Sequence, residues 1–177
     1  MTTYNILSTM ISNRDAVPKV LTDSYVAGGH VLASEGYVQT HGAADAAGTT
    51  YRMFSIPSNA RVEGMKFSND VLATGCTVDV GVWWPTYIPV GAGLLSSIAS
   101  TVIHTTLFAS VLNCSAAAAD TNILNQSLAN GIATQELPLW AAAGLASDPM
   151  IELDIVVYVA AAVAQQGYIG LKASYAK

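Results

Sequence analysis

The segment Gly75–Trp84 places an apolar residue at every second position. Successive side chains of a β-strand point to opposite faces, so a period of two predicts a half-buried strand. The segment Met150–Val159 has the same period. The apolar members of the two runs are Cys76, Val78, Val80, Val82, Trp84, Ile151, Leu153, Ile155, Val157 and Val159. The sequence therefore predicts two strands that each bury one face.

Much of the remaining chain also has the pattern of short strands separated by turn residues. We predict these strands at Val31–Thr40, Thr49–Ile56, Ala60–Ser68, Val102–Leu112 and Tyr168–Tyr175. Val102–Leu112 also suits a short helix, but its Thr and Val content favours a strand. The second and third are expected to form a hairpin across the Pro-Ser-Asn turn between them. The strand Met150–Val159 and the last strand are expected to form another hairpin.

Helices are few in the predicted structure. One or two helical turns are expected after Pro138, with Gly144 at their end. Asp120-Thr121-Asn122 is expected to cap a short helix. Strands and helices do not alternate in the way that a parallel sheet requires. The predicted fold class is therefore all-β, a jelly-roll-like β-sandwich with short helical segments.

The beginning of the chain lacks a regular hydrophobic period. Residues 1–19 are interpreted as an N-terminal arm, in which Pro18 favours an extended conformation at Val17. Residues 20–177 are assigned to the β-sandwich domain. A length of 177 residues suits one domain with such an arm.

The chain is poor in charge for its length. Charged residues make up 11% and hydrophobic residues 52%, whereas an average domain has roughly 25% charged residues. The most apolar window, Leu94–Leu112, still contains His104 and several Ser and Thr residues, which argues against a membrane span. The net charge is −5 without a basic cluster, which argues against nucleic acid. Protein partners remain, because the cores of protein interfaces are depleted in charge.

No group of side chains has the spacing of a catalytic or metal site. His30, His41 and His104 lie in separate segments, without the close pairs of a zinc site. Cys76 and Cys114 are predicted to be buried, reduced thiols. We therefore expect no metal, no cofactor and no enzymatic activity.

Two carboxylates come nearest to a catalytic pair. Glu152 and Asp154 share one face of a predicted strand, where their separation could suit glycoside hydrolysis. A solvated sheet face is the favoured interpretation of this pair.

Adjacent tryptophans at 83 and 84 must point to opposite faces of their strand. The period assigns Trp84 to the core and Trp83 to the outer face. Trp83 is then either exposed, where it could anchor a protein or stack on a sugar, or covered by the uncharged segment Tyr87–Ser100. The sequence leaves both possibilities open.

Three stretches together resemble a known family. They are residues 47–57 with 60–65 and 75–82 (AGTTYRMFSIP, ARVEGM and GCTVDVGV), residues 137–145 with Asp148-Pro149 (LPLWAAAGL), and residues 154–157 with 167–171 (DIVV and GYIGL). In this order they resemble the head decoration, or cement, proteins of tailed bacteriophages, over roughly residues 34–175. The resemblance implies a jelly-roll-like sandwich that binds the exterior of the capsid as an oligomer. It brings no catalytic motif.

The expected function is therefore that of a virion structural protein that stabilises the capsid shell. Its expected partners are the major capsid protein and further copies of itself, as a dimer or trimer, with no nucleic acid and no membrane. It would be assembled in the host cytoplasm and reside on the capsid exterior. The predicted contact residues are Thr2, Tyr4, Ile6, Leu7, Met10, Ile11, Val17, Trp83, Tyr87 and Ile88.

Two alternatives remain at this level. One is a carbohydrate-binding adhesion module of a virion, with Trp83 and Tyr87 as a stacking platform. The other is a structural subunit of a phage tail.

Overall fold

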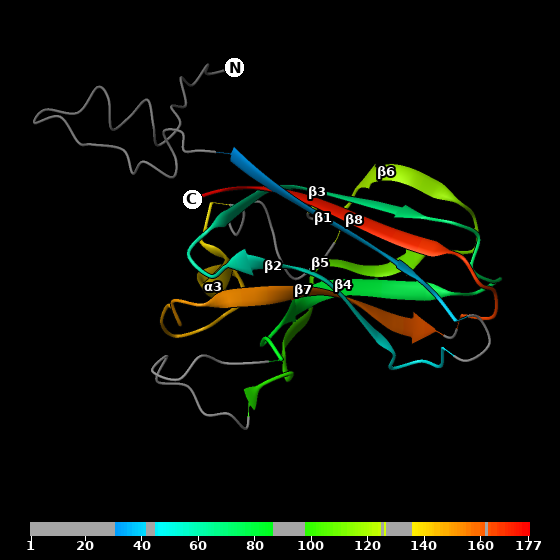
Figure 1. Ribbon diagram of the computed structural model, residues 1–177, viewed down its shortest axis with the longest axis horizontal. Coiled ribbons are helices and arrows are strands. Elements are labelled where there is room, and N and C mark those ends of the chain that lie inside the picture. Colours follow the sequence, from blue (N-terminus) through cyan, green and yellow to red (C-terminus); the bar gives the residue numbers. More distant parts are fainter. Residues whose placement is uncertain (1–30, 42–44, 87–97, 125, 127–135, 162) are drawn as a thin grey trace, which may run out of the picture.

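Eight strands and one short helix make up the computed structural model, which describes residues 31–41, 45–86, 98–124, 126, 136–161 and 163–177 (Figure 1). The elements are β1 (Val31–Gln39), β2 (Thr50–Pro57), β3 (Arg61–Asn69), β4 (Thr77–Trp83), β5 (Val102–Asn113), β6 (Ala118–Asn122), α3 (Leu139–Ala142), β7 (Glu152–Ala161) and β8 (Tyr168–Ala176). The predicted arm at residues 1–19 and its boundary with the domain lie outside the described residues. No helix of the described chain is long and apolar enough to cross a membrane.

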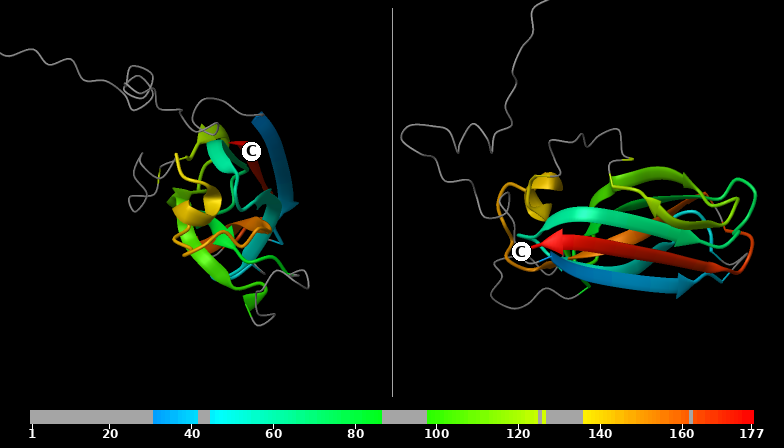
Figure 2. Two further views of the ribbon diagram at one scale, coloured as in Figure 1. Left: turned by 90° about the vertical axis from the view of Figure 1, so that its left-hand side faces the viewer. Right: turned by 90° about the horizontal axis from the view of Figure 1, so that it is seen from above.

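The strands form two four-stranded sheets, here called sheet 1, in the order β1-β8-β3-β6, and sheet 2, in the order β2-β7-β4-β5. Within them β1 pairs with β8, β2 with β7, β3 with β6 and β4 with β5, all antiparallel. In a jelly roll the first strand pairs with the last, the second with the second-last, and so on inward, and these four pairs follow that pattern. The predicted all-β, jelly-roll-like sandwich is confirmed, and the right-hand view of Figure 2 shows the strands of sheet 1 side by side.

The core lies between the two sheets and follows the predicted alternation. Val78, Val80 and Val82 of β4 are fully buried, as are Leu153 and Ile155 of β7. From sheet 1, β3 and β8 contribute the facing layer, with Met65, Phe67, Ile169 and Leu171. Burying apolar surface on both sheets is the main stabilising contribution to a sandwich of this kind.

Both predicted hairpins are wrong. β2 lies in sheet 2 and β3 in sheet 1, and β7 and β8 are separated in the same way. In a jelly roll most consecutive strands cross between the sheets, so short turns join strands that do not pair. Asp120, Thr121 and Asn122, which were expected to cap a short helix, instead belong to β6 and pair with β3, and most of the residues that follow them, where that helix was expected, lie outside the described chain.

One end of the sandwich, here called the α3 end, is closed by α3. The Leu139 N–H donates to the Ala60 carbonyl oxygen at 2.8 Å, and the Trp140 N–H donates to that of Ser58 at 3.0 Å. These bonds join α3 to the turn between β2 and β3. β1 begins at the same end, because Val31 pairs with Ala176 beside Lys177 (Figure 1). The short helix that was predicted after Pro138 is confirmed.

Candidate functional site

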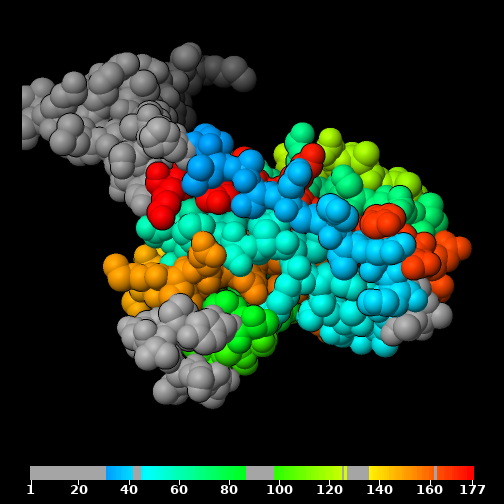
Figure 3. Space-filling view, viewed as in Figure 1, coloured from blue at the N-terminus to red at the C-terminus, as the bar shows by residue number. Residues whose placement is uncertain are grey.

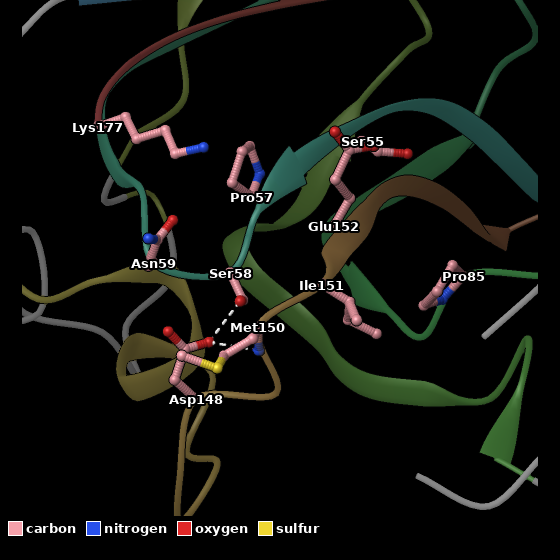
Figure 4. Close-up of a pocket in the computed structure, with 10 residues that line it drawn as sticks. All are labelled: Ser55, Pro57, Ser58, Asn59, Pro85, Asp148, Met150, Ile151, Glu152 and Lys177. Carbon is pink, nitrogen blue, oxygen red and sulfur yellow. Dashed lines mark hydrogen bonds between the residues drawn. The ribbon is translucent and has the colours of Figure 1, made fainter. Parts of the chain in front are cut away.

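A hollow of about 520 Å³ opens at the α3 end (Figure 4). Its lining residues come from the end of β2, the start of β7 and the ends of two connections. They are Ser55, Pro57, Ser58, Asn59, Pro85, Asp148, Met150, Ile151, Glu152 and Lys177. The lining combines apolar side chains with the carboxylates of Asp148 and Glu152 and the ammonium group of Lys177.

Asp148 fixes the shape of this hollow. One of its carboxylate oxygens accepts hydrogen bonds from the Ser58 hydroxyl at 2.5 Å and from the Met150 N–H at 2.8 Å. The second bond holds Met150 at a φ of 55°, a left-handed conformation that costs energy for a residue with a side chain. Met150 is 88% exposed. A large apolar side chain held in solvent by a strained backbone is a candidate contact residue, and the sequence period did not reveal it.

An ion pair supports the connection that follows β4. The Arg52 guanidinium donates to a carboxylate oxygen of Asp154 and, at 3.0 Å, to the Trp84 carbonyl oxygen. The other Asp154 oxygen accepts the Ser55 hydroxyl at 2.8 Å. The two described ends of the connection also bond to each other, because the Ser100 N–H donates to the Pro85 carbonyl oxygen at 2.9 Å. Both ends are therefore fixed to the domain by hydrogen bonds.

The two carboxylates on the outer face of β7, Glu152 and Asp154, are in different surroundings. The prediction of a solvated face is wrong for Asp154, which is 9% exposed and engaged by Arg52 and Ser55. Glu152 is exposed and lines the hollow.

Trp83 does point away from the core, but it is not exposed. Its side chain is 5% exposed and its ring stacks on Tyr158, with 6.3 Å between the ring centroids. Trp84 is half-buried against the core, as predicted. Trp83 therefore offers neither a protein contact nor a sugar platform in this structure. The alternation in the sequence correctly placed Trp83 on the outer face of its strand, but it could not show that Tyr158 covers the ring.

The other predicted contact residues lie outside the described chain. These are Thr2, Tyr4, Ile6, Leu7, Met10, Ile11, Val17, Tyr87 and Ile88. Their points of attachment are described, and both lie at the α3 end: β1 begins at Val31, beside Lys177, and the segment that holds Tyr87 follows Pro85. Lys177 and Pro85 both line the hollow.

Asp45 forms a buried polar cluster between β1 and β2. It is 5% exposed and accepts hydrogen bonds from the Tyr51 hydroxyl at 2.7 Å and the His41 N–H at 2.5 Å. Burial alone would raise the pKa of Asp45, but these hydrogen bonds outweigh it and leave that pKa below its usual value. Burial, together with the carboxylate, raises the pKa of Tyr51.

Cys76 and Cys114 are buried and unbridged, as predicted. Burial raises the pKa of the Cys114 thiol to about 12 and also raises that of Cys76, so both are poor nucleophiles. Among the described residues, no three His, Cys, Asp or Glu side chains gather in a way that could hold a metal ion.

The sequence matches no protein-family model and no curated protein. Among solved structures, the chain is similar to one in the capsid of Ralstonia phage GP4, with a TM-score of 0.51, 23% identity, and coverage of 84% of this chain and 85% of that one. A chain of the cyanophage Pam1 capsid asymmetric unit matches with a TM-score of 0.46, 18% identity and coverage of 84% and 86%. Only the first score supports an argument, and it shows that this chain shares its fold with a phage capsid chain.

Proposed function

We propose that this chain is a virion structural protein that decorates a phage capsid and stabilises the shell by binding the major capsid protein. The observation that carries the proposal is the jelly-roll fold shared with a chain of the Ralstonia phage GP4 capsid. The low charge, 11% of residues, supports it because a lattice protein hides surface against several neighbours. The phage-tail alternative has no structural observation in its favour.

The proposal also gives the molecule an orientation. The described residues to which the predicted arm and the Tyr87–Ile88 segment attach, Val31 and Thr86, both lie at the α3 end, where the hollow and the exposed Met150 are found. In the proposed role this end faces the shell, and the arm and the connection reach onto the major capsid protein.

We propose further that this role involves no catalysis. In the hollow at the α3 end the Ser58 hydroxyl donates to Asp148, but the same carboxylate oxygen also accepts the Met150 N–H, and no histidine of the described chain lines the hollow to complete a catalytic triad. The carbohydrate-binding alternative loses its platform because Trp83 is buried.

Co-sedimentation with undecorated heads tests the binding role. The full chain should bind heads of its own phage saturably. Removing residues 1–19 or introducing Met150→Glu should each weaken binding by about tenfold or more, because each removes an apolar contact from the interface. Val71→Glu makes the same kind of change at an exposed valine outside the hollow (47% exposed) and should leave binding unchanged. Full occupancy by both altered proteins would refute the proposed orientation, and absence of binding by the full chain would refute the function.

A further inference from the structure

β1 is an edge strand without the features that usually protect sheet edges. Exposed edges are normally blunted by short strands, bulges, prolines or charges. β6 has five residues and a register shift against β3, and β2 has a shift against β7 and ends at Pro57. β5 shows three shifts against β4. β1 instead pairs with β8 over nine residues in unbroken register, contains no proline, and carries one charge, Glu35 (Figure 2, right).

The backbone groups that face the free edge of β1 can be assigned. The Thr40 N–H, just after β1, donates to the Gly167 carbonyl oxygen, so even-numbered residues of β1 point toward β8. On the other side of β8, the Asp70 N–H donates to the Tyr168 carbonyl oxygen, which is consistent with this assignment. The odd-numbered residues therefore present N–H and C=O groups to the free edge. They are Val31, Ala33, Glu35, Tyr37 and Gln39.

The side chains of the same residues lie on the outer face of sheet 1, and two of them are large and apolar. Val31 is 67% exposed and Tyr37 is 81% exposed, near the two ends of β1. Leu32, on the opposite face, is 42% exposed. An occupant of this edge must therefore be an extended strand that offers apolar side chains at matching positions and no negative charge opposite Glu35.

We propose that the occupant is β1 of a second copy, paired antiparallel about a two-fold axis at Ser34. In this register Val31 of each copy lies opposite Tyr37 of the other, and Ala33 lies opposite Glu35. Each pair joins residues whose N–H and C=O groups both face the edge, as the hydrogen-bonded pairs of an antiparallel ladder require. The two copies of sheet 1 then form one continuous eight-stranded sheet.

Charge and side-chain size select this register over its neighbours. Pairing centred on Glu35 would set two carboxylates directly opposite each other, which is unfavourable. Pairing centred on Ala33 would set Val31 against Glu35 and leave Tyr37 without a partner. Pairing centred on Ser34 gives two aromatic–β-branched pairs. It also leaves intact the ion pair within each chain between the Glu35 carboxylate and the Lys172 Nζ, which are 3.4 Å apart.

The inference stands apart from the proposed capsid role, because dimers can be tested without heads. Sedimentation equilibrium of the full chain from about 1 µM to 1 mM should show monomer and dimer. Ala33→Glu places a carboxylate opposite each partner's Glu35, and should raise the Kd for dimerisation by about tenfold or more. Ala33→Lys places an ammonium group there instead, and should lower the Kd by about threefold. Val102→Glu, at an exposed valine of the edge strand β5, should leave the Kd unchanged.

The two substitutions at Ala33 are expected to change the Kd in opposite directions, whereas a general disturbance of β1 would raise the Kd in both cases. Circular dichroism shows whether each protein is folded. A full chain that stays monomeric over the whole range overturns the inference. So does an oligomer that responds equally to Ala33→Glu and Ala33→Lys, or a trimer indifferent to both.

Discussion

At the scale of single residues, Asp45 places a buried charge in the folded state. Its carboxylate is buried and accepts hydrogen bonds from Tyr51 and from the backbone of His41. Such a charge is tolerated because its hydrogen bonds replace water. The cluster joins the residues that follow β1 to β2, and hence the edge of sheet 1 to the edge of sheet 2.

Asp45→Asn should lower the free energy of unfolding by about 1–3 kcal/mol at pH 7, because charge-assisted hydrogen bonds to Tyr51 and His41 are lost. The folded pKa of Asp45 lies below its usual value, so its contribution is complete above the unfolded pKa of about 3.9 and is lost as pH falls through the folded pKa. Urea unfolding of the unaltered protein and of Asp45→Asn, from pH 7 to pH 3, measures this contribution. The difference between their free energies of unfolding should shrink below about pH 4. A difference that is the same at every pH would contradict the stabilising role assigned to the Asp45 carboxylate.

Single residues also show which contacts could not be predicted from the sequence. Alternation placed Trp83 and Asp154 on the outer faces of their strands, which is correct. It gave no sign that Tyr158 stacks on Trp83 or that Arg52 binds Asp154, because those partners are distant in sequence. Met150 was missed for a related reason, since its exposure follows from the conformation that Asp148 imposes on it.

At the scale of elements, the pairing of β4 with β5 depends on a glycine. Between Val80↔Ala109 and Val82↔His104, β5 inserts extra residues that bulge over Gly81. A Cβ atom at Gly81 would fall well inside contact distance of the His104 and Thr105 carbonyl oxygens. The long strand β5 can therefore fold over β4 only because position 81 has no side chain.

Gly81→Ala should lower the free energy of unfolding by about 3 kcal/mol, because the clash is with backbone atoms that cannot move independently. Gly170→Ala is the matched control, since its Cβ atom would meet nothing closer than 3.8 Å. That change should be neutral or slightly stabilising, because alanine restricts the unfolded chain. Chemical denaturation of both proteins decides the matter, and equal stabilities would contradict the account of the bulge.

Most strands could be predicted from the sequence, whereas their partners could not. The period of two is a local property, and it placed most of the strands well. Which strands pair depends on contacts between distant segments, so the turn at Pro57–Asn59 suggested a hairpin where the chain actually crosses between sheets. β6 was missed because Ala, Asp and Asn have low strand propensity, and its pairing with β3 overrides that preference.

At the scale of the whole molecule, the α3 end and the β1 edge offer two separate surfaces. The α3 end carries the hollow, Met150 and the attachment points of the arm and of the connection after Pro85. The β1 edge runs along the side of the sandwich, where Figure 3 shows it on the surface. In the proposed role one surface binds the shell and the other joins neighbouring copies, so that weak contacts reinforce each other through multivalency.

Electron cryomicroscopy of undecorated heads mixed with the full chain tests the central claim most directly. The account predicts ordered density for this sandwich at regular positions of the shell, with the α3 end toward the major capsid protein. Heads without added density at saturating protein, or sandwiches bound through the opposite end, would contradict it.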